Sequence, residues 1–362
     1  MSAADVIVAG GGPAGAAAAI GLAAAGCRVV VVERSTGPED KVCGEFLSGE
    51  TMTLAARLGV DVAGLGARPI GRVGVPGGAA VRSVALPFAA AGLSRRRLDE
   101  ALLARAAAAG AEILRGGAVR GFAVDADGAT VTLDGGRVLA ARRLVVATGK
   151  HDLRDHHRPQ GPQGDLVGFK MHYAPADPSA LDGRVDLLGL PGGYAGLQRI
   201  EDGLVNLCLL VGRDRLAAAG GFDGVVADLV RRTPALAGLL ARPVLPRPLA
   251  IARLPYGFVR RRADGVRWVG DQAAVIPSFT GDGMAIALWT GTEAAASILA
   301  GETTDAFQAR VAATLAGQVG RAAAVSRLMV RPWFQTLAAT AAARLPGLAR
   351  ALARTTRLPV AV

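Results

Sequence analysis

The chain has 362 residues, enough for two or three domains, and 51% of them are hydrophobic, which excludes a disordered protein. It contains 41 Lys and Arg residues against 30 Asp and Glu residues, but eight arginines after Asp305 supply +8 of the +11 net charge and leave only +3 for the first 305 residues. This uneven charge, without aromatic residues interleaved among the basic ones, argues against nucleic acid as a partner.

Residues 6–27 contain no charged residue and are long enough to cross a bilayer. The run is broken by three consecutive glycines and Pro13, which end a helix at that point. The segment therefore predicts a buried strand over 5–9, a tight loop and an alanine-rich helix over 14–25. A second buried strand follows over 28–33, so the chain opens with a βαβ unit.

The spacing of apolar residues predicts the later helices and strands. A helix is predicted from Leu98 to Gly110, followed by strands over 131–133 and 143–147. Beyond Gly164, short runs separated by Gly, Pro and Asp predict antiparallel strands over 166–172, 184–190, 194–200 and 204–211, with 72–86 of similar texture. Residues 222–241 read as a helix, 266–269 as a buried strand, and those from 284 onward as helices interrupted by Pro332, Pro346 and Pro359.

The three cysteines, Cys27, Cys43 and Cys208, are widely spaced and form no Cys-x-x-Cys pair. They predict neither a disulfide framework nor a zinc site, and they fit a reducing, cytoplasmic compartment. The four histidines have no metal-binding spacing. His172 could face a pocket, but we favour an ordinary strand position for it. We therefore expect no metal.

The first loop carries Gly10-x-Gly12-x-x-Gly15 between a predicted strand and a predicted helix. Gly10 permits the tight turn, Gly12 lets a pyrophosphate approach the backbone, and Gly15 lets helix and strand pack closely, with the anion at the helix N-terminus. Glu33 ends the second strand 18 residues after Gly15, where it can accept hydrogen bonds from a ribose. An acidic residue there disfavours a 2′-phosphate, which predicts FAD or NAD rather than NADP.

A second loop decides between these dinucleotides. Gly270-Asp271 follows a predicted strand, and Pro277 precedes Gly281-Asp282-Gly283, which opens a helix at Met284. An NAD dehydrogenase needs no such loop, whereas this arrangement resembles the FAD-binding fold of the aromatic-hydroxylase and geranylgeranyl-reductase flavoproteins. The resemblance implies that Asp271 is a buried carboxylate on the ribityl chain. It also implies that backbone N–H groups of the later turn face the flavin, so Asp282 is expected to matter less.

Two further segments resemble the same superfamily. Arg95-x-x-Leu98-Asp99 resembles its arginine-led helix, which implies that Arg95 reaches the phosphate–ribose region, although three consecutive arginines can also be a solvated helix start. Ala147-Thr148-Gly149 resembles the strand end that closes against FAD. The predicted FAD contacts are Gly10, Gly12, Pro13, Ala14, Gly15, Glu33, Arg34, Arg95, Val119, Thr148, Gly149, Asp271, Pro277, Gly281, Gly283 and Met284.

The segment Lys41-Val42-Cys43-Gly44-Glu45 resembles the cysteine–glycine segment of the geranylgeranyl-reductase branch, which lies near the isoalloxazine. The resemblance implies that Cys43 lies against the ring and that Glu45 orients it or takes part in proton transfer. These two are the predicted catalytic residues. The alternative is a buried structural cysteine in a tight turn, the commoner fate of a free cysteine.

The resemblance covers roughly residues 1–300 and has two departures. Lys150-His151-Asp152 stands where hydroxylases usually carry a second Asp-Gly motif, and the late motif reads Gly270-Asp271-Gln272-Ala273-Ala274 instead of Gly-Asp-Ala-Ala-His. Both departures bear on how a nicotinamide is handled, and they leave FAD binding intact.

These elements predict an α/β fold, in which a Rossmann-like FAD-binding domain carries an inserted antiparallel-sheet substrate domain and C-terminal helices. The discontinuous FAD-binding domain is assigned residues 1–66, 93–160 and 262–305, the substrate domain 67–92 and 161–261, and the C-terminal helical segment 306–362.

The resulting prediction is an FAD-dependent oxidoreductase acting on an apolar or aromatic small molecule. An NAD(P)H-driven monooxygenase that hydroxylates an aromatic or polyketide-like molecule is favoured, because it is the commoner activity. The first alternative is reduction of an isolated C=C in a prenyl or lipid chain, with Cys43 or Glu45 as proton donor. The second is a flavin-binding protein without catalysis.

The C-terminal segment 306–362 combines eight arginines and no acidic residue with apolar residues such as Trp333 and Leu337. That mixture suits a helix lying on an anionic membrane surface. The alternative, which we favour from the sequence, is a closing helix packed on the FAD-binding domain with its arginines in water.

Overall fold

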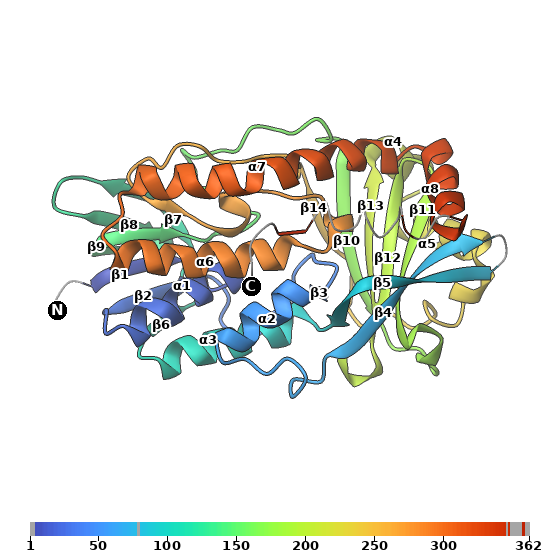
Figure 1. Cartoon of the computed structure of the whole chain (residues 1–362), viewed down its shortest axis with the longest axis horizontal. Coiled ribbons are helices and arrows are strands. Elements are labelled where there is room, and N and C mark those ends of the chain that lie inside the picture. Colours follow the sequence, from blue (N-terminus) through green and yellow to red (C-terminus); the bar gives the residue numbers. More distant parts are fainter. Residues whose placement is uncertain (1–3, 78–79, 345–346, 348–356, 359–362) are drawn as a thin grey trace.

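Two large sheets, each covered by its own helices, form the computed structural model, which describes residues 4–77, 80–344, 347 and 357–358 (Figure 1). The first sheet has the order β6 (Glu112–Arg115), β2 (Val29–Glu33), β1 (Ala4–Ala9), β9 (Val138–Val146), β8 (Ala129–Leu133) and β7 (Val119–Val124), with β15 (Arg267–Trp268) pairing with β9. The strands β1, β2, β6, β9 and β15 pair in parallel, whereas β7 and β8 pair antiparallel.

Strand β1 is buried on both faces, as its unbroken apolar run predicts. Val6 and Val8 point into the core beneath the helices, and Ile7 and Ala9 point into the core on the opposite side, because successive strand side chains alternate. The helical layer consists of α1 (Pro13–Ala24), α2 (Gly49–Arg57), α3 (Arg95–Ala108), α6 (Gly283–Leu299) and α7 (Thr304–Met329). Helix α1 packs between α3 and α6, and its small alanine side chains allow that close approach.

The second sheet has the order β14 (Leu249–Ala252), β10 (Leu166–Tyr173), β13 (Val205–Gly212), β12 (Gly193–Arg199), β11 (Gly183–Leu190), β4 (Arg68–Gly77), β5 (Ala80–Gly92) and β3 (Phe46–Ser48). It is antiparallel except for the parallel pair β11–β4. One face packs on α5 (Phe222–Arg232), with α4 (Arg213–Ala218) following β13. The predicted α/β class with a largely antiparallel second sheet is confirmed.

One helix boundary predicted from the sequence is wrong. Helix α5 ends at Arg232 rather than continuing to residue 241, and a short 3₁₀ turn begins at Pro234. Thr233 is extended, with φ −137° and ψ 80°, because the residue before a proline is disfavoured in the helical region.

The C-terminal segment folds back over both sheets. Helix α7 runs along the upper edge of the molecule in Figure 1, and α8 (Pro332–Arg344) follows it onto β4, β5 and β11. Further on, Arg357 and Leu358 are buried, with Arg357 donating to the carboxylate of Glu50 near α2. Among the described residues, no helix is both long and apolar enough to cross a membrane.

Candidate active site

A cavity of about 650 Å³ lies between the two sheets, within the usual size of a ligand site. Its walls come from the loop before α1, the ends of β2 and β7, the Cys43 loop, strands β10, β13 and β14, and the start of α6. Every predicted site residue lines this cavity except Gly15 and Pro277. Gly10 and Met284, at opposite ends of this set of predicted residues, are therefore brought to the same cavity, although the contacts of these residues with a ligand stay predictions.

The loop before α1 depends on two glycines. Gly10 has φ +113°, and a Cβ there would lie 2.3 Å from the Ala147 carbonyl oxygen. A Cβ on Gly15 would lie 1.9 Å from the Gly10 carbonyl oxygen, so Gly15 shapes the loop without lining the cavity. Gly12 is the N-cap of α1 and has no side chain to cap the helix, and Pro13 follows it. The first N–H groups of α1 thus remain available to an anion.

Glu33 is 4% exposed and closes the adjacent wall of the cavity. One carboxylate oxygen accepts a hydrogen bond from the Gly11 N–H at 2.7 Å, and the other accepts from the Ser35 N–H and hydroxyl. Burial by itself raises the Glu33 pKa, but Lys41 and these hydrogen bonds outweigh it, so the pKa is lowered overall. The carboxylate is therefore charged and oriented at neutral pH.

Arg95 faces the same loop. Its guanidinium makes two hydrogen bonds to Asp99, at 2.7 and 2.8 Å, one helical turn away. Burial opposes the charge, but Asp99 and then Cys43 raise the Arg95 pKa overall. Arg97 instead bonds Asp202 away from the cavity, so the structure places Arg95 at the site, as the spacing predicted.

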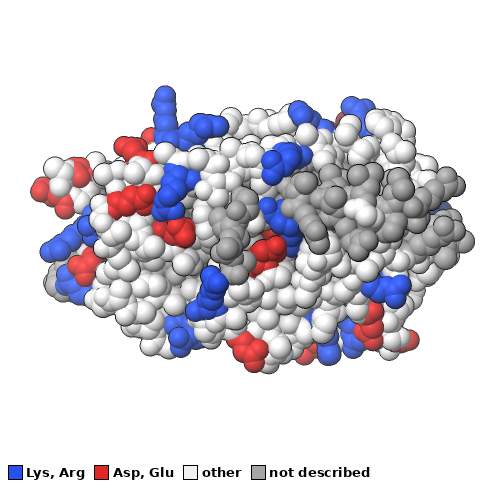
Figure 2. Space-filling model, viewed as in Figure 1, with Lys and Arg blue, Asp and Glu red and all other residues white. Residues whose placement is uncertain are grey.

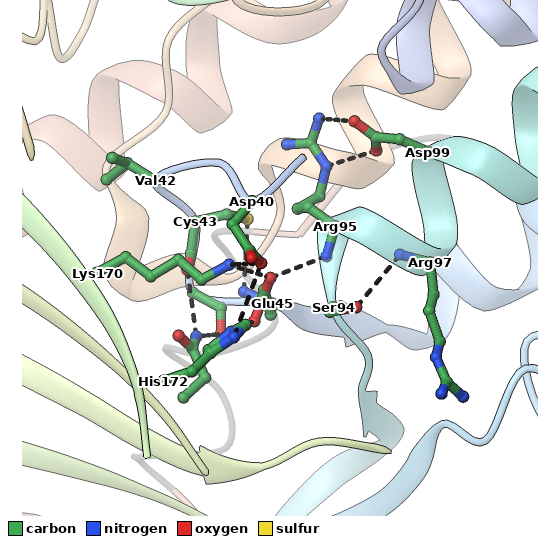
Figure 3. Close-up of polar contacts among 12 residues, drawn as sticks. Asp40, Val42, Cys43, Glu45, Ser94, Arg95, Arg97, Asp99, Lys170 and His172 are labelled. Atoms are coloured by element: carbon green, nitrogen blue, oxygen red, sulfur yellow. Dashed lines mark hydrogen bonds and ion pairs between the residues drawn. The ribbon is translucent and has the colours of Figure 1, made fainter. Parts of the chain in front are cut away.

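The loop containing Cys43 and Glu45 is held by side chains from the second sheet, here called the sheet clamp: Lys170 and His172 of β10, Gln198 of β12 and Asn206 of β13. Asn206 donates to the carbonyl oxygens of Cys43 and Gly44, and Gln198 donates to that of Glu45. Figure 3 shows Lys170 and His172 reaching the Glu45 carboxylate. The clamp sets the position at which Cys43 meets the cavity.

Glu45 is completely buried, and both of its carboxylate oxygens are occupied. The first accepts from the Lys170 ammonium at 2.5 Å and from the Arg95 backbone N–H at 2.8 Å, and the second lies 2.7 Å from His172 Nε2. Glu45 also has φ +57°, a strained conformation for a residue with a side chain. Of the two roles considered from sequence, these contacts favour orientation over proton transfer.

Sequence reasoning missed Lys170 and misjudged His172, which is a buried partner of Glu45 and not an ordinary strand residue. Lys170 is 0% exposed and also lies 3.0 Å from Asp40. Ligand atoms of Asp40, Glu45 and His172 lie within 4.8 Å of one another, but the Lys170 ammonium between the carboxylates supplies the positive charge there. Burial opposes that charge, yet Glu45 and Asp40 raise the Lys170 pKa. The available signal was a lysine within an otherwise apolar strand, one of three in the chain.

The two aspartates of the late loops differ from what the motif predicted. Asp271 is half-buried in the protein alone, and its carboxylate faces the cavity without a hydrogen bond or ion pair to the described residues. Asp282, expected to matter less than Asp271 for holding FAD, is completely buried. It accepts from Gln318 Nε2 at 2.5 Å, and Arg357 lies 3.5 Å away, so it joins α6 to the C-terminal segment.

Residues at the two departures from the superfamily pattern bond to one another. Gln272 donates from Nε2 to the carbonyl oxygens of Gly149 and His151, each at 2.9 Å. Arg158 donates to the carbonyl oxygens of Asp271 and Lys150 and to the Asp152 carboxylate. Gln272 and Arg158 therefore connect the part of the cavity wall at Thr148 and Gly149 to the part at Asp271. Only the tertiary contacts reveal this role.

The cavity becomes apolar toward the second sheet. This wall contains Leu210, Leu249, Ile251, Leu254, Val275 and Ile276, with the Tyr256 ring among them. Cys43 and Cys208 line the cavity between this wall and the glycine loop. Both thiols are half-buried, and burial raises the pKa of the Cys208 thiol to about 12.

Comparison with known proteins agrees with this geometry. Residues 3–153 match the family described as FAD binding domain. A menaquinone reductase of Mycolicibacterium smegmatis is 29% identical over 83% of this chain and 78% of that protein, and a digeranylgeranylglycerophospholipid reductase 1 of Methanopyrus kandleri is 28% identical over 79% and 78%. The chain belongs to the FAD-dependent oxidoreductase superfamily.

This flavoprotein is also similar to a monooxygenase and to a solved flavoprotein structure. A 12-dehydrotetracycline 5-monooxygenase/anhydrotetracycline 6-monooxygenase of Streptomyces rimosus is 33% identical, but over only 36% of this chain and 27% of that protein. The solved structure of a flavoprotein/dehydrogenase from Cytophaga hutchinsonii has a TM-score of 0.82 at 16% identity, covering 97% of this chain and 92% of that one. The structural similarity confirms the fold.

The described residues of the flavoprotein fit FAD. The uncapped start of α1 suits the pyrophosphate, the oriented Glu33 carboxylate suits a ribose, and Arg95 lies beside the glycine loop. The unpaired Asp271 carboxylate suits the ribityl hydroxyls, and Met284 at the start of α6 suits the flavin end.

Proposed function

We propose that this flavoprotein is a reductase that saturates a C=C bond in an isoprenoid-like lipid, using FAD and an NAD(P)H-type reductant. The relatives that match about four-fifths of the chain are named as reductases of menaquinone and of digeranylgeranylglycerophospholipid, both of which are lipids. The monooxygenase match spans 36% of the chain. The sequence alone favoured monooxygenation because that activity is commoner, and this broader coverage is the reason for the different proposal.

One observation carries the proposal: an accessible thiol lies where the apolar wall meets the glycine loop. The wall offers aliphatic side chains and a single phenol, Tyr256, whose hydroxyl is engaged with Ser278 at 3.1 Å. Such a wall suits an aliphatic chain, because it offers few hydrogen bonds for a polar ring substrate. Cys43 borders this wall on a loop that the sheet clamp holds in place.

Saturating a C=C bond requires one hydride and one proton. FAD, when bound and reduced, supplies the hydride. Cys43 Sγ–H supplies the proton to the other carbon, and solvent then reprotonates the sulfur. Asp99 and, to a smaller extent, Cys43 raise the Arg95 pKa, so Arg95 provides a positive charge beside the Cys43 sulfur. Glu45 orients the loop and does not itself donate, because Lys170 and His172 occupy both of its carboxylate oxygens.

The experiment compares product masses. Purified flavoprotein is reduced anaerobically and then supplied with menaquinone or a geranylgeranyl lipid. The lipid is extracted, and its mass is measured by mass spectrometry. We expect flavin reoxidation without oxygen and a product heavier by two hydrogens, which fragmentation should place in the isoprenoid chain, because reduction of a quinone ring to the quinol adds the same mass. A product heavier by one oxygen atom, formed only after oxygen is admitted, would instead establish the monooxygenase.

Cys43→Ala tests the proton donor, with Cys27→Ala as the matched control, because Cys27 packs in the helical core away from the cavity. General-acid catalysis contributes roughly a hundredfold or more, so Cys43→Ala should lose about that factor in rate while retaining bound FAD. Equal rates for both variants would remove Cys43 from the chemistry. Absence of flavin reoxidation by any lipid, with full FAD content, would favour a flavin-binding protein without catalysis.

A further inference from the structure

Helix α8 and the end of α7 present an unusual surface, here called the α8 face: Arg327, Leu328, Arg331, Trp333 and Leu337. Trp333 is 61% exposed, Leu337 57% and Leu328 39%, and together they make up three of the seven large hydrophobic side chains exposed among the described residues. Trp333 and Leu337 are four residues apart, so they lie on one side of α8. An exposed apolar group of this kind marks an interaction surface.

The opposite side of α8 is anchored to the second sheet. Gln335 donates from Nε2 to the carbonyl oxygens of Leu190 and Gly193, at 3.0 and 2.8 Å, and to that of Met329 at the end of α7. The helix is therefore held in place, and its apolar residues point outward from a fixed platform. Helix α8 thus packs on the second sheet, whereas the sequence favoured packing on the FAD-binding domain.

The charge around this face has one sign. Arg327 and Arg331 are exposed and have no acidic partner among the described residues. Arg310, farther along α7, is already paired with Glu293 and Glu302. No acidic residue follows Asp305 in the sequence, and Figure 2 shows basic side chains along the margin above α7, with acidic side chains beside them toward the left. The complementary partner is thus anionic as well as apolar.

The chain that joins α7 to α8 contacts the apolar end of the cavity. Met329, the last residue of α7, and Val330, which follows it, pack in a cluster with Leu210, Leu254 and Tyr256. Those three residues line the cavity. The segment that joins α7 to α8 therefore packs against the apolar end of the cavity.

We propose that the α8 face docks the flavoprotein on an anionic lipid bilayer, with Trp333 and Leu337 entering the interface and Arg327 and Arg331 contacting lipid phosphates. Apolar burial and attraction to anionic headgroups act together in such surface binding. The docking claim stands on the α8 face itself, whereas its purpose of collecting an isoprenoid-like substrate rests on the proposed function.

The test is co-sedimentation of the full chain with vesicles of equal parts phosphatidylglycerol and phosphatidylcholine, and with phosphatidylcholine alone. We expect binding to the anionic vesicles that weakens with salt, and much weaker binding to the neutral ones. Each of Arg327→Gln and Arg331→Gln should weaken binding about fivefold. The double variant Trp333→Ser/Leu337→Ser should weaken it roughly tenfold or more.

Val138→Ser is the matched control, because Val138 is a 58% exposed apolar residue on β9, away from α8. Its vesicle binding should equal that of the unchanged chain, and every variant should retain FAD and its melting temperature. No binding to anionic vesicles at low salt, or equal binding by the Trp333→Ser/Leu337→Ser variant, would overturn the proposal. A change of oligomeric state in that variant without a change in vesicle binding would assign the face to a protein partner instead.

Turnover with detergent-dispersed lipid separates the two proposals. Vesicle binding without lipid reduction would support the docking surface and contradict the proposed function. Reduction of dispersed lipid without vesicle binding would support the proposed function and contradict the docking surface.

Discussion

The two walls of the cavity are built by different means. On the glycine-loop side, the backbone forms the site: Gly10 and Gly15 bring chain segments within contact, and the first N–H groups of α1 remain available. On the sheet-clamp side, the backbone is regular strand, and side chains such as Lys170 and His172 form the site. We therefore expect added atoms to disrupt the glycine-loop side, and loss of a charged side chain to disrupt the sheet-clamp side.

The largest effect is expected where the sheet clamp loses its charge. Lys170→Met leaves Glu45 buried without its ammonium partner, and breaking such a pair costs about 3–5 kcal/mol of unfolding free energy. Because Lys170 has a raised pKa, its contribution is fully present below the ordinary lysine pKa and is lost only as pH rises through the folded value. The deficit measured by denaturant unfolding should therefore be the same at neutral and mildly alkaline pH.

Two controls separate this loss from a general effect of removing a cation. Arg28→Met breaks a surface pair with Asp5, which should cost far less stability because solvent screens both charges. Adding Glu45→Gln to Lys170→Met should recover part of the stability, since the unpaired charge is then gone. A Lys170→Met protein as stable as Arg28→Met would contradict the sheet clamp.

The glycine-loop side is tested by adding one carbon. Gly15→Ala forces a Cβ against the Gly10 carbonyl oxygen, and overpacking of this severity should cost about 3 kcal/mol and release FAD. Gly121→Ala on β7 is the control, because a Cβ there meets no atom within 4 Å. Flavin absorbance and thermal melting of both variants measure the difference, and retention of FAD by Gly15→Ala would refute the backbone construction.

A third prediction separates cofactor binding from folding in the late loops. Asp271→Ala should lose about 1.5–3 kcal/mol of FAD affinity, the contribution of a charge-assisted hydrogen bond, with little change in the unfolding of the FAD-free protein. Asp282→Ala should instead lower the melting temperature of the FAD-free protein, because Asp282 joins α6 to Gln318 and Arg357. Equal FAD affinities for both variants by titration would refute the assignment of Asp271.

The smallest effect concerns pH. Burial raises the pKa of Asp282 to about 6, so the folded protein retains a proton that the unfolded chain has already released. Stability from this group is therefore greatest below the unfolded pKa of about 4 and falls by about 2 kcal/mol as pH rises to the folded value. Asp282→Asn should remove this slope from denaturant unfolding curves across the same pH range, and an unchanged slope would contradict the assignment.

The sequence by itself determined the glycine-loop side. Gly10, Gly12, Gly15 and Glu33 lie within a single βαβ unit, where the backbone constraints of each turn are local and leave a readable spacing. The α/β class followed from the same local periodicities. Helix α5 was predicted too long because the influence of Pro234 on the preceding residue was not weighed.

Only the tertiary structure decided the sheet-clamp side. Lys170 and Glu45 are 125 positions apart and meet because β10 faces the Cys43 loop, a juxtaposition that no spacing records. The same holds for Asp282, which is buried by contacts from α7 and from Arg357. Side-chain sites assembled across two sheets depend on how those sheets pack, and the energy of that packing is spread over many residues, none of which carries a motif.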